Sequence, residues 1–172
     1  MLARFVAIGV MLMSVDAGAQ PERDKWLVAH GAKQLDQNAH DYWDVYNEIY
    51  RGDGGNCVEL RVGAKREAAL LCDQGWDVGG PATFLLLKRV IYVVRGGNVV
   101  KVLDVPVDLF NLDSSWRACP KALAVRVARD GRSVAVDPTD AGCAGSDPVA
   151  DESRRINAAP GVYRWRGDRF QR

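Results

Sequence analysis

The feature that most constrains the fold is a pair of six-residue segments with a cysteine at the outer end of each. Residues 57–62 (CVELRV) and 67–72 (EAALLC) are separated by the four residues GAKR. If residue 62 pairs with residue 67 in an antiparallel hairpin, Cys57 falls opposite Cys72, at a Cα separation that a disulfide can bridge. The same register places five apolar side chains on one face: Val58, Leu60, Val62, Ala69 and Leu71. Because a one-residue slip would exchange the two faces, this agreement predicts both the register and a Cys57–Cys72 disulfide.

A second hairpin is marked by Asp130-Gly131, since Asp-Gly between alternating apolar residues is a strong turn signal. Its strands are predicted over residues 121–129 and 132–137. Two pairs of valines then oppose one another: Val125 with Val136, and Val127 with Val134.

The other two cysteines, Cys119 and Cys143, lie beyond the two ends of this hairpin. Extending its register brings Cys119 opposite residue 142, one position short of Cys143. We therefore expect a second disulfide, Cys119–Cys143, at the base of the hairpin. An even number of cysteines is also typical of exported chains that are stabilised by disulfides.

A third hairpin is predicted around Gly96-Gly97, between residues 84–95 and 98–105. Its register pairs apolar residues on both faces: Ile91 with Val102, Val93 with Val100, Val90 with Leu103, and Val94 with Val99. Apolar residues on both faces indicate central strands that are covered on both sides. The same register aligns Arg89 with Asp104 as a cross-strand ion pair.

The ends of the chain indicate helix before the hairpins and one more strand after them. Residues 24–37 have a weak helical pattern, and residues 38–51 have apolar side chains at helical spacing in a composition that also suits a strand. Residues 161–166 (GVYRWR) alternate and predict an edge strand, whereas residues 137–160 are predicted to be a loop. We therefore expect an α+β fold, with an N-terminal helical segment packed on an antiparallel sheet of hairpins; an all-β sandwich or barrel is the alternative.

Residues 1–19 have the three parts of a secretory signal peptide. Arg4 supplies the positive charge, residues 5–15 supply an apolar stretch too short to span a bilayer, and Ala17-Gly18-Ala19 supplies the cleavage site. The sequence thus predicts a bacterial protein, periplasmic or secreted, whose residues 20–172 form a single domain without a membrane span after the signal peptide.

Sequence motifs for catalysis are missing from the 172 residues. No serine lies in a G-x-S-x-G motif, no glycine-rich phosphate loop is present, and the cysteines are assigned to disulfides. The two histidines, His30 and His40, are ten residues apart, which does not by itself place them on one metal site. The acidic residues of the segment 137–152 do not follow a calcium-loop pattern. These observations favour a non-enzymatic protein without a cofactor or metal ion.

The candidate binding residues are aromatic and basic. Residues 153–172 carry six arginines and one acidic residue, and aromatic side chains alternate with several of these arginines. The weak candidates in this tail are Tyr163, Arg164, Trp165, Arg166 and Arg169. Arginine with aromatic side chains can bind an anionic polymer, but the neighbouring acidic segment 130–152 could instead neutralise the tail. Trp76 and Trp116, in predicted loops, are further candidates as anchors for a protein partner.

The leading functional prediction is a cell-envelope binding module that docks on another protein, such as an inhibitor or immunity-type protein. One alternative is a small envelope hydrolase that uses carboxylates or histidine. A second alternative is a binder of anionic glycans through the arginine-rich C-terminal strand. Nucleic acid is disfavoured because the formal net charge is only +1.

Cleavage of the signal peptide can be tested directly. We expect the exported protein to begin at Gln20, because the small-residue site ends at Ala19. Intact-mass measurement of protein purified from the envelope or the medium checks this. Retention of residues 1–19 in that material would contradict the prediction of export.

Overall fold

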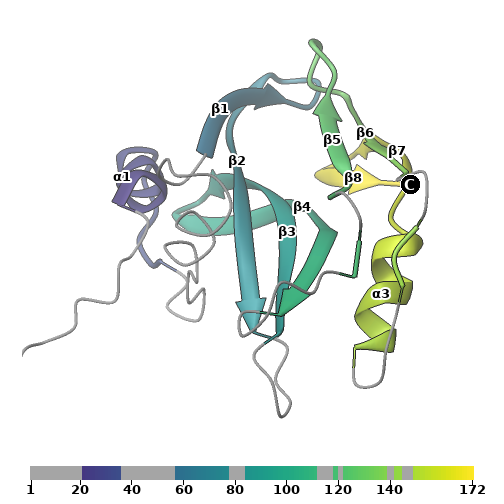
Figure 1. Cartoon of the computed structure of the whole chain (residues 1–172). Coiled ribbons are helices and arrows are strands. Elements are labelled where there is room, and N and C mark those ends of the chain that lie inside the picture. The colour runs from purple at the N-terminus through teal and green to yellow at the C-terminus, as the bar shows by residue number, and fades with distance from the viewer. Residues whose placement is uncertain are drawn as a thin grey trace, which may run out of the picture.

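The structure, a computed structural model, describes residues 21–35, 57–77, 84–111, 118–119, 122–138, 142–144 and 149–172. These residues form two antiparallel sheets of four strands each, with strand orders β1-β2-β3-β4 and β5-β6-β7-β8 (Figure 1). The first sheet consists of β1 (Cys57–Val62), β2 (Glu67–Asp77), β3 (Phe84–Arg95) and β4 (Asn98–Asn111). The second consists of β5 (Ala124–Val127), β6 (Ser133–Asp137), β7 (Gly161–Arg166) and β8 (Arg169–Gln171). The helices are α1 (Pro21–Ala29) and α3 (Ala150–Asn157).

The predicted registers of the β1–β2 and β5–β6 hairpins are confirmed. Val62 pairs with Glu67 and Cys57 with Cys72, and the two predicted valine pairs of β5 and β6 are also present. Both predicted disulfides form, Cys57–Cys72 with a Cα separation of 4.2 Å and Cys119–Cys143 with 4.3 Å. Two disulfides indicate an oxidising compartment outside the cytoplasm. Neither helix in the described part of the chain is long and apolar enough to cross a membrane.

The predicted register of β3 and β4 holds for the first four pairs from the turn and is wrong beyond them, because β4 bulges. Tyr92 pairs with Lys101 but Ile91 pairs with Leu103, so Val102 has no directly opposed residue. A regular strand would point Val102 and Leu103 to opposite faces, whereas here both are buried in the same core. The physical reason for the shift is therefore the burial of two consecutive apolar side chains.

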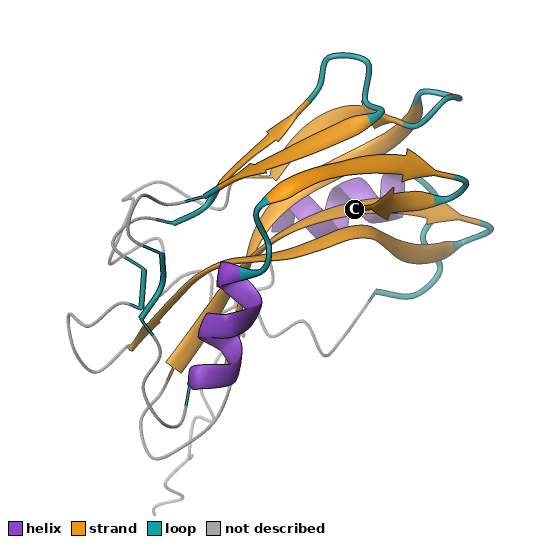
Figure 2. Cartoon of the chain, turned by 90° about the vertical axis from the view of Figure 1, so that its right-hand side faces the viewer, coloured by secondary structure: helices purple, strands orange, loops and turns teal. Residues whose placement is uncertain are grey.

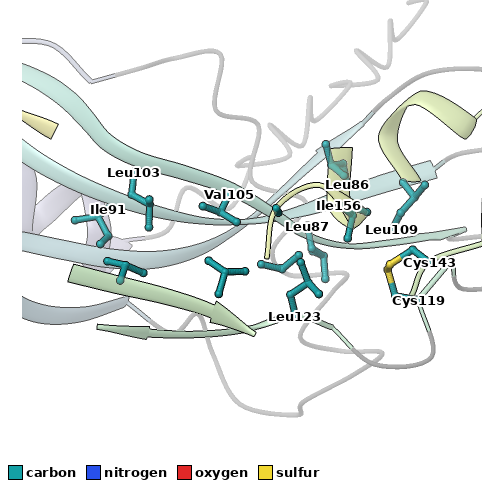
Figure 3. Packing of buried hydrophobic residues seen from close by; sticks show 14 of the residues in the cluster. Leu86, Leu87, Ile91, Leu103, Val105, Leu109, Cys119, Leu123, Cys143 and Ile156 are labelled. Atoms are coloured by element: carbon teal, nitrogen blue, oxygen red, sulfur yellow. A yellow bond between two sulfur atoms is a disulfide. The ribbon is translucent and has the colours of Figure 1, made fainter. Parts of the chain in front are cut away.

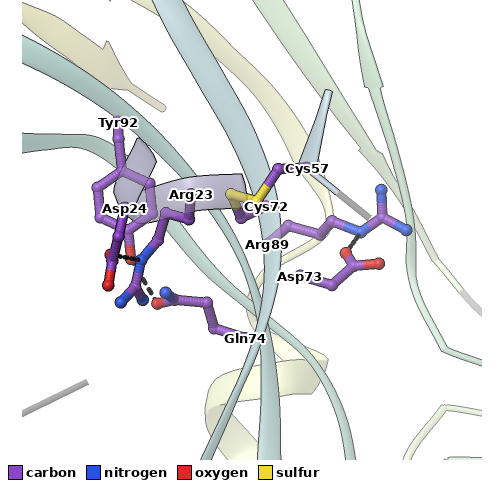
Figure 4. Close-up of a disulfide and its surroundings, with 8 residues drawn as sticks. All are labelled: Arg23, Asp24, Cys57, Cys72, Asp73, Gln74, Arg89 and Tyr92. Carbon is purple, nitrogen blue, oxygen red and sulfur yellow. Dashed lines mark hydrogen bonds and ion pairs between the residues drawn. A yellow bond between two sulfur atoms is a disulfide. The ribbon is translucent and has the colours of Figure 1, made fainter. Parts of the chain in front are cut away.

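The bulge also changes the predicted ion pair between Arg89 and Asp104. Arg89 lies opposite Val105 and forms an ion pair with Asp73 of β2 instead (Figure 4). Asp104 pairs with Lys88, at a distance of 3.2 Å between Nζ and Oδ1. Each charge still has a partner: that of Arg89 lies on β2 instead of β4, and that of Asp104 is the neighbouring residue on β3.

One hydrophobic core lies between the two sheets (Figures 2 and 3). From the first sheet it includes fully buried side chains such as Leu85, Ile91 and Val93, and from the second it includes Val134 and Val136. The domain is therefore mostly β, with two sheets packed on a shared core. This arrangement is closer to the sandwich alternative than to the predicted α+β fold built on one sheet.

The N-terminal helix covers the outer face of the first sheet, as predicted. Trp26 and Leu27 of α1 are buried against Leu70, Cys72 and Val90 of β2 and β3. The helix begins earlier than predicted and ends before Gly31, whose φ of +90° suits a C-terminal glycine. The predicted helix over residues 38–51 lies outside the described residues.

The C-terminal part differs from its prediction in two ways. Residues 150–157, predicted to be loop, form the helix α3, which buries Ile156 and has acidic residues in its first turn and basic residues in its last. Strand β7 is not an edge strand, because the three-residue strand β8 follows it and pairs with it. The short length of α3 and β8 explains why their hydrophobic periodicity is too weak to predict them.

The two sheets come into backbone contact where the turn of the β1–β2 hairpin meets the turn of the β5–β6 hairpin. The amide of Gly63 donates a hydrogen bond of 2.9 Å to the carbonyl of Gly131. A Cβ atom on Gly131 would lie only 1.9 Å from the carbonyl oxygen of Arg61. Glycine at position 131 is therefore required both for its φ of +69° and for this close approach.

Replacing Gly131 by alanine should destabilise the protein by about 2–4 kcal/mol, from the left-handed backbone and from the steric clash together. Gly96→Ala is the matched control, because Gly96 also has a positive φ, +59°, but no atom within 4 Å of the added methyl group. The control should cost only about 1–2 kcal/mol. Urea unfolding of the two variants gives both values, and equal destabilisation would contradict a steric role for Gly131.

Candidate functional site

The four hairpin turns that the structure describes lie at the same end of the two sheets, as Figure 2 shows. They comprise residues 63–66, 96–97, 128–132 and 167–168, which join β1 to β2, β3 to β4, β5 to β6 and β7 to β8. Turns at one end of a rigid β scaffold are a common place for binding residues. In this protein the turns also contact one another, and exposed cations lie in them and on the strand ends beside them.

Arg95, at the end of β3, joins three of these segments. Its Nε and Nη2 donate hydrogen bonds of 2.9 and 2.7 Å to the two carboxylate oxygens of Glu67. Its Nη1 donates a third, of 2.9 Å, to the backbone carbonyl of Asp168. The hydrogen bonds to Glu67 raise the pKa of Arg95 above its ordinary value. The guanidinium also lies 5.7 Å from the ring centre of Trp165, within the range of a cation–π contact.

The aromatic side chains of β7 point toward the core. Trp165 is half-buried, contacts Phe170 edge-to-face at 5.0 Å, and donates its indole N–H to the carbonyl of Gly167. A Cβ atom on Gly63 would lie 2.6 Å from the Trp165 ring, so the β1–β2 turn lies directly against the indole. The hydroxyl of Tyr163 donates to the carbonyl of Ala159. Both rings therefore have structural contacts inside the sandwich.

The arginines of β7 point the other way, because side chains alternate along a strand. Arg164 and Arg166 are exposed, and Arg169 of β8 lies directly opposite Arg166. Like charges directly opposite one another on a sheet are destabilising. Asp168 in the turn between them pairs with Arg169 at 3.3 Å, and hydrogen bonds from Arg169 lower the pKa of the Asp168 carboxyl. One carboxylate thus faces two opposed arginines.

The turns add cations that the sequence analysis missed. Lys65 and Arg66 are exposed in the β1–β2 turn, and Arg129 and Arg132 in the β5–β6 turn. Arg66 crosses between the turns and donates a hydrogen bond of 2.9 Å to the carbonyl of Arg129. We call the combined surface the basic end: Lys65, Arg66, Arg129, Arg132, Arg164, Arg166 and Arg169. The sequence does contain a pattern that could have identified these turn residues. They lie beside Gly63 and Gly131, in the turns of hairpins whose register the sequence predicts.

The acidic segment 130–152 pairs elsewhere. Asp137 pairs with Arg126 of β5 at 2.8 Å, and Asp151 pairs with Arg154 within α3. In the part of this segment that the structure describes, no carboxylate pairs with Arg164, Arg166 or Arg169. The basic end therefore keeps a net positive charge that these carboxylates do not balance.

Of the two tryptophans expected in loops, only position 76 lies within the described residues. Residue 76 belongs to β2 and pairs with Leu86, so it is not in a loop; Trp116 lies outside the described residues. His30, the histidine that the structure describes, stacks on Trp26 at 3.7 Å and hydrogen-bonds through Nδ1 to that residue's carbonyl oxygen. Across the described ranges, no three histidine, cysteine or acidic side chains lie together as metal ligands.

Because Arg95 has structural contacts and Arg166 is exposed, we expect their substitution to affect stability differently. Arg95→Gln should lower the free energy of unfolding by about 1–3 kcal/mol, because it removes charged hydrogen bonds and leaves Glu67 without them. Arg166→Gln should change it by less than about 0.5 kcal/mol, or raise it, because it relieves repulsion from Arg169. Denaturant unfolding measures both, and a large loss in Arg166→Gln would show that Arg166 is structural.

Comparison of the chain with protein-family models, with curated proteins and with solved structures finds no match. The basic end, where side chains from both sheets are brought together, is the feature of this chain that best fits a binding surface.

Proposed function

We propose that the protein is a non-catalytic binding module, periplasmic or secreted, that docks on the acidic surface of another protein through the basic end. The observation that carries this proposal is the directly opposed pair Arg166 and Arg169, with Arg164 beside it on the same exposed face. Such a pair costs stability in the free protein, so its benefit is best explained by an anionic partner that neutralises it.

A protein partner is favoured over a glycan by the direction of the aromatic side chains. Recognition of sugar rings or of bases commonly uses exposed aromatic rings as stacking surfaces. Tyr163 and Trp165 have their contacts inside the sandwich instead. The outer face of the second sheet, away from these rings, carries the arginines beside the small residue Ala135 and beside Val162, which is 49% exposed. Arginine together with apolar contact area is typical of protein–protein interfaces.

The surroundings of the basic end support binding by a preformed surface. Its cations lie on paired strands and on turns that are joined by backbone hydrogen bonds and by Arg95, so little ordering is needed when a partner docks. The export that residues 1–19 predict would bring this surface to partners outside the cytoplasm. A hydrolase that depends on His30 has less support, because His30 stacks on Trp26 and hydrogen-bonds to its carbonyl oxygen.

The proposal can be tested by retention of partners on the immobilised protein. Envelope extract is passed over the exported protein and over a variant in which Arg164, Arg166 and Arg169 are replaced by serine. We expect the native protein to retain an acidic protein that salt releases, and the variant to lose it, because the interaction depends on these charges. The matched control replaces Arg61, Arg154 and Arg155 by serine, which removes the same charge from exposed positions on β1 and α3.

Two outcomes would contradict the proposal. If the control variant loses retention as completely as the triple variant, net charge rather than this face is responsible. If no protein is retained but the native protein binds a heparin column in a salt-sensitive way that the triple variant loses, the anionic-glycan alternative is correct.

A further inference from the structure

The outer face of the second sheet carries a row of three exposed side chains along β7. In order they are Val162, Arg164 and Arg166, and we call them the β7 row. Side chains on one face of a strand repeat every two residues, at a spacing of about 6.4–6.8 Å. The β7 row therefore presents one apolar position and then two positive charges at a regular interval.

The strand on one side of the β7 row contributes only small side chains beside it. On β6, Ser133 lies directly opposite Arg164, and Ala135 lies directly opposite Val162. Both are half-buried, and neither is long enough to cover the neighbouring position on β7. A segment of another protein can therefore lie over the row without displacing a bulky neighbour.

The strand on the other side, β8, adds hydrogen-bond donors. Arg169 lies directly opposite Arg166, and Gln171 lies directly opposite Arg164. Asp168, in the turn, pairs with Arg169 at 3.3 Å and so balances one of these charges. The guanidinium groups and the Gln171 amide can all donate hydrogen bonds, and guanidinium groups match the two oxygens of a carboxylate.

The remaining carboxylate of this face does not balance the β7 row. Asp137 of β6 pairs with Arg126 of β5 at 2.8 Å. None of the carboxylates in the described ranges forms an ion pair with Arg164 or Arg166. The two arginines of the row therefore keep their charge for a partner.

We propose that the β7 row is where the partner docks, and that it takes an extended acidic segment of that protein. This inference rests on the proposed function, because it names the part of the acidic partner that the basic end recognises. In an extended segment, residues i, i+2 and i+4 lie on one face at the same spacing as the row. Two carboxylates then face Arg164 and Arg166, and an aliphatic side chain faces Val162, which is 49% exposed.

A helical segment matches the β7 row less well. Side chains four residues apart on a helix are separated by about 6 Å along its axis, but each such step turns them by about 40°. The third side chain would thus point about 80° away from the first and would leave the sheet. An extended segment twists in the same sense as β7, so its side chains stay over the row.

The test compares two peptides on the full exported protein. In GESESLSESEG, glutamate and leucine alternate with serine symmetrically, so leucine can face Val162 and two glutamates the arginines in either chain direction. In GEESSLSSEEG the composition is the same, but serine faces Arg164 when leucine faces Val162. Both peptides are acetylated and amidated, so only their glutamates are charged. We expect the alternating peptide to bind about fivefold more tightly, because it makes one more ion pair.

NMR titration measures both affinities and the place of binding, through the amides of Ser133, Val162 and Arg164. Arg164→Ser should abolish the fivefold preference, because the two peptides differ in the residue that faces position 164. Arg126→Ser is the matched control, since it removes one exposed charge from the same face but outside the β7 row. This control should keep the preference, and circular dichroism checks that both variants fold.

The outcomes separate this inference from the proposed function. If the peptides bind the native protein equally and both lose affinity in the triple arginine variant, the basic end binds acidic segments but the β7 row does not select an extended one. If neither peptide binds at millimolar concentration, the inference is wrong, whereas the retention experiment independently decides whether the basic end binds a protein. If Arg126→Ser abolishes the preference as completely as Arg164→Ser, total charge and not the row is responsible, and the inference is overturned.

Discussion

The close approach of two hairpin turns, Gly63 to Gly131, is the constraint on which the rest of the molecule depends. It brings the backbone of β1 to the turn of the β5–β6 hairpin and so fixes how the second sheet lies over the first. A side chain larger than hydrogen at position 131 would separate these backbones, since the Arg61 carbonyl occupies the space. Through this contact the core between the sheets closes at the same end at which the cations gather.

Closing the sandwich at this end brings like charges together, which lowers the stability of the folded protein. Residues from both sheets concentrate positive charge there, and only some of it is balanced by Glu67 and Asp168. The structure uses Arg95 to hold the turns together and leaves Arg164 and Arg166 exposed. The same residue type therefore has a structural role on β3 and is available for binding on β7. These two roles could not be distinguished from composition, because they depend on which arginine side chain lies beside a carboxylate in the folded protein.

The parts of the fold that the sequence predicts are those determined by contacts close in sequence. The registers of the β1–β2 and β5–β6 hairpins, and both disulfides, follow from turn residues and alternation within 25 residues of chain. The bulge at Val102 could not be predicted, because it depends on the core that the second sheet provides. The arginines of β7 were predicted as candidates from the concentration of arginine in residues 153–172 and from the aromatic residues between them. Lys65 and Arg66 were missed because their importance arises only when two distant turns meet.

The placement of the disulfides affects how the chain reaches this structure. Each bridge joins cysteines that are close in sequence, 15 and 24 residues apart, and every other pairing of the four cysteines spans a longer stretch. Loop-closure entropy therefore favours the native pairing over both of its competitors in a chain that is still unfolded. Oxidation can proceed correctly before the two sheets have met, so the covalent pattern does not depend on the tertiary fold being complete. A protein built in this way has little need of disulfide shuffling once its hairpins begin to form.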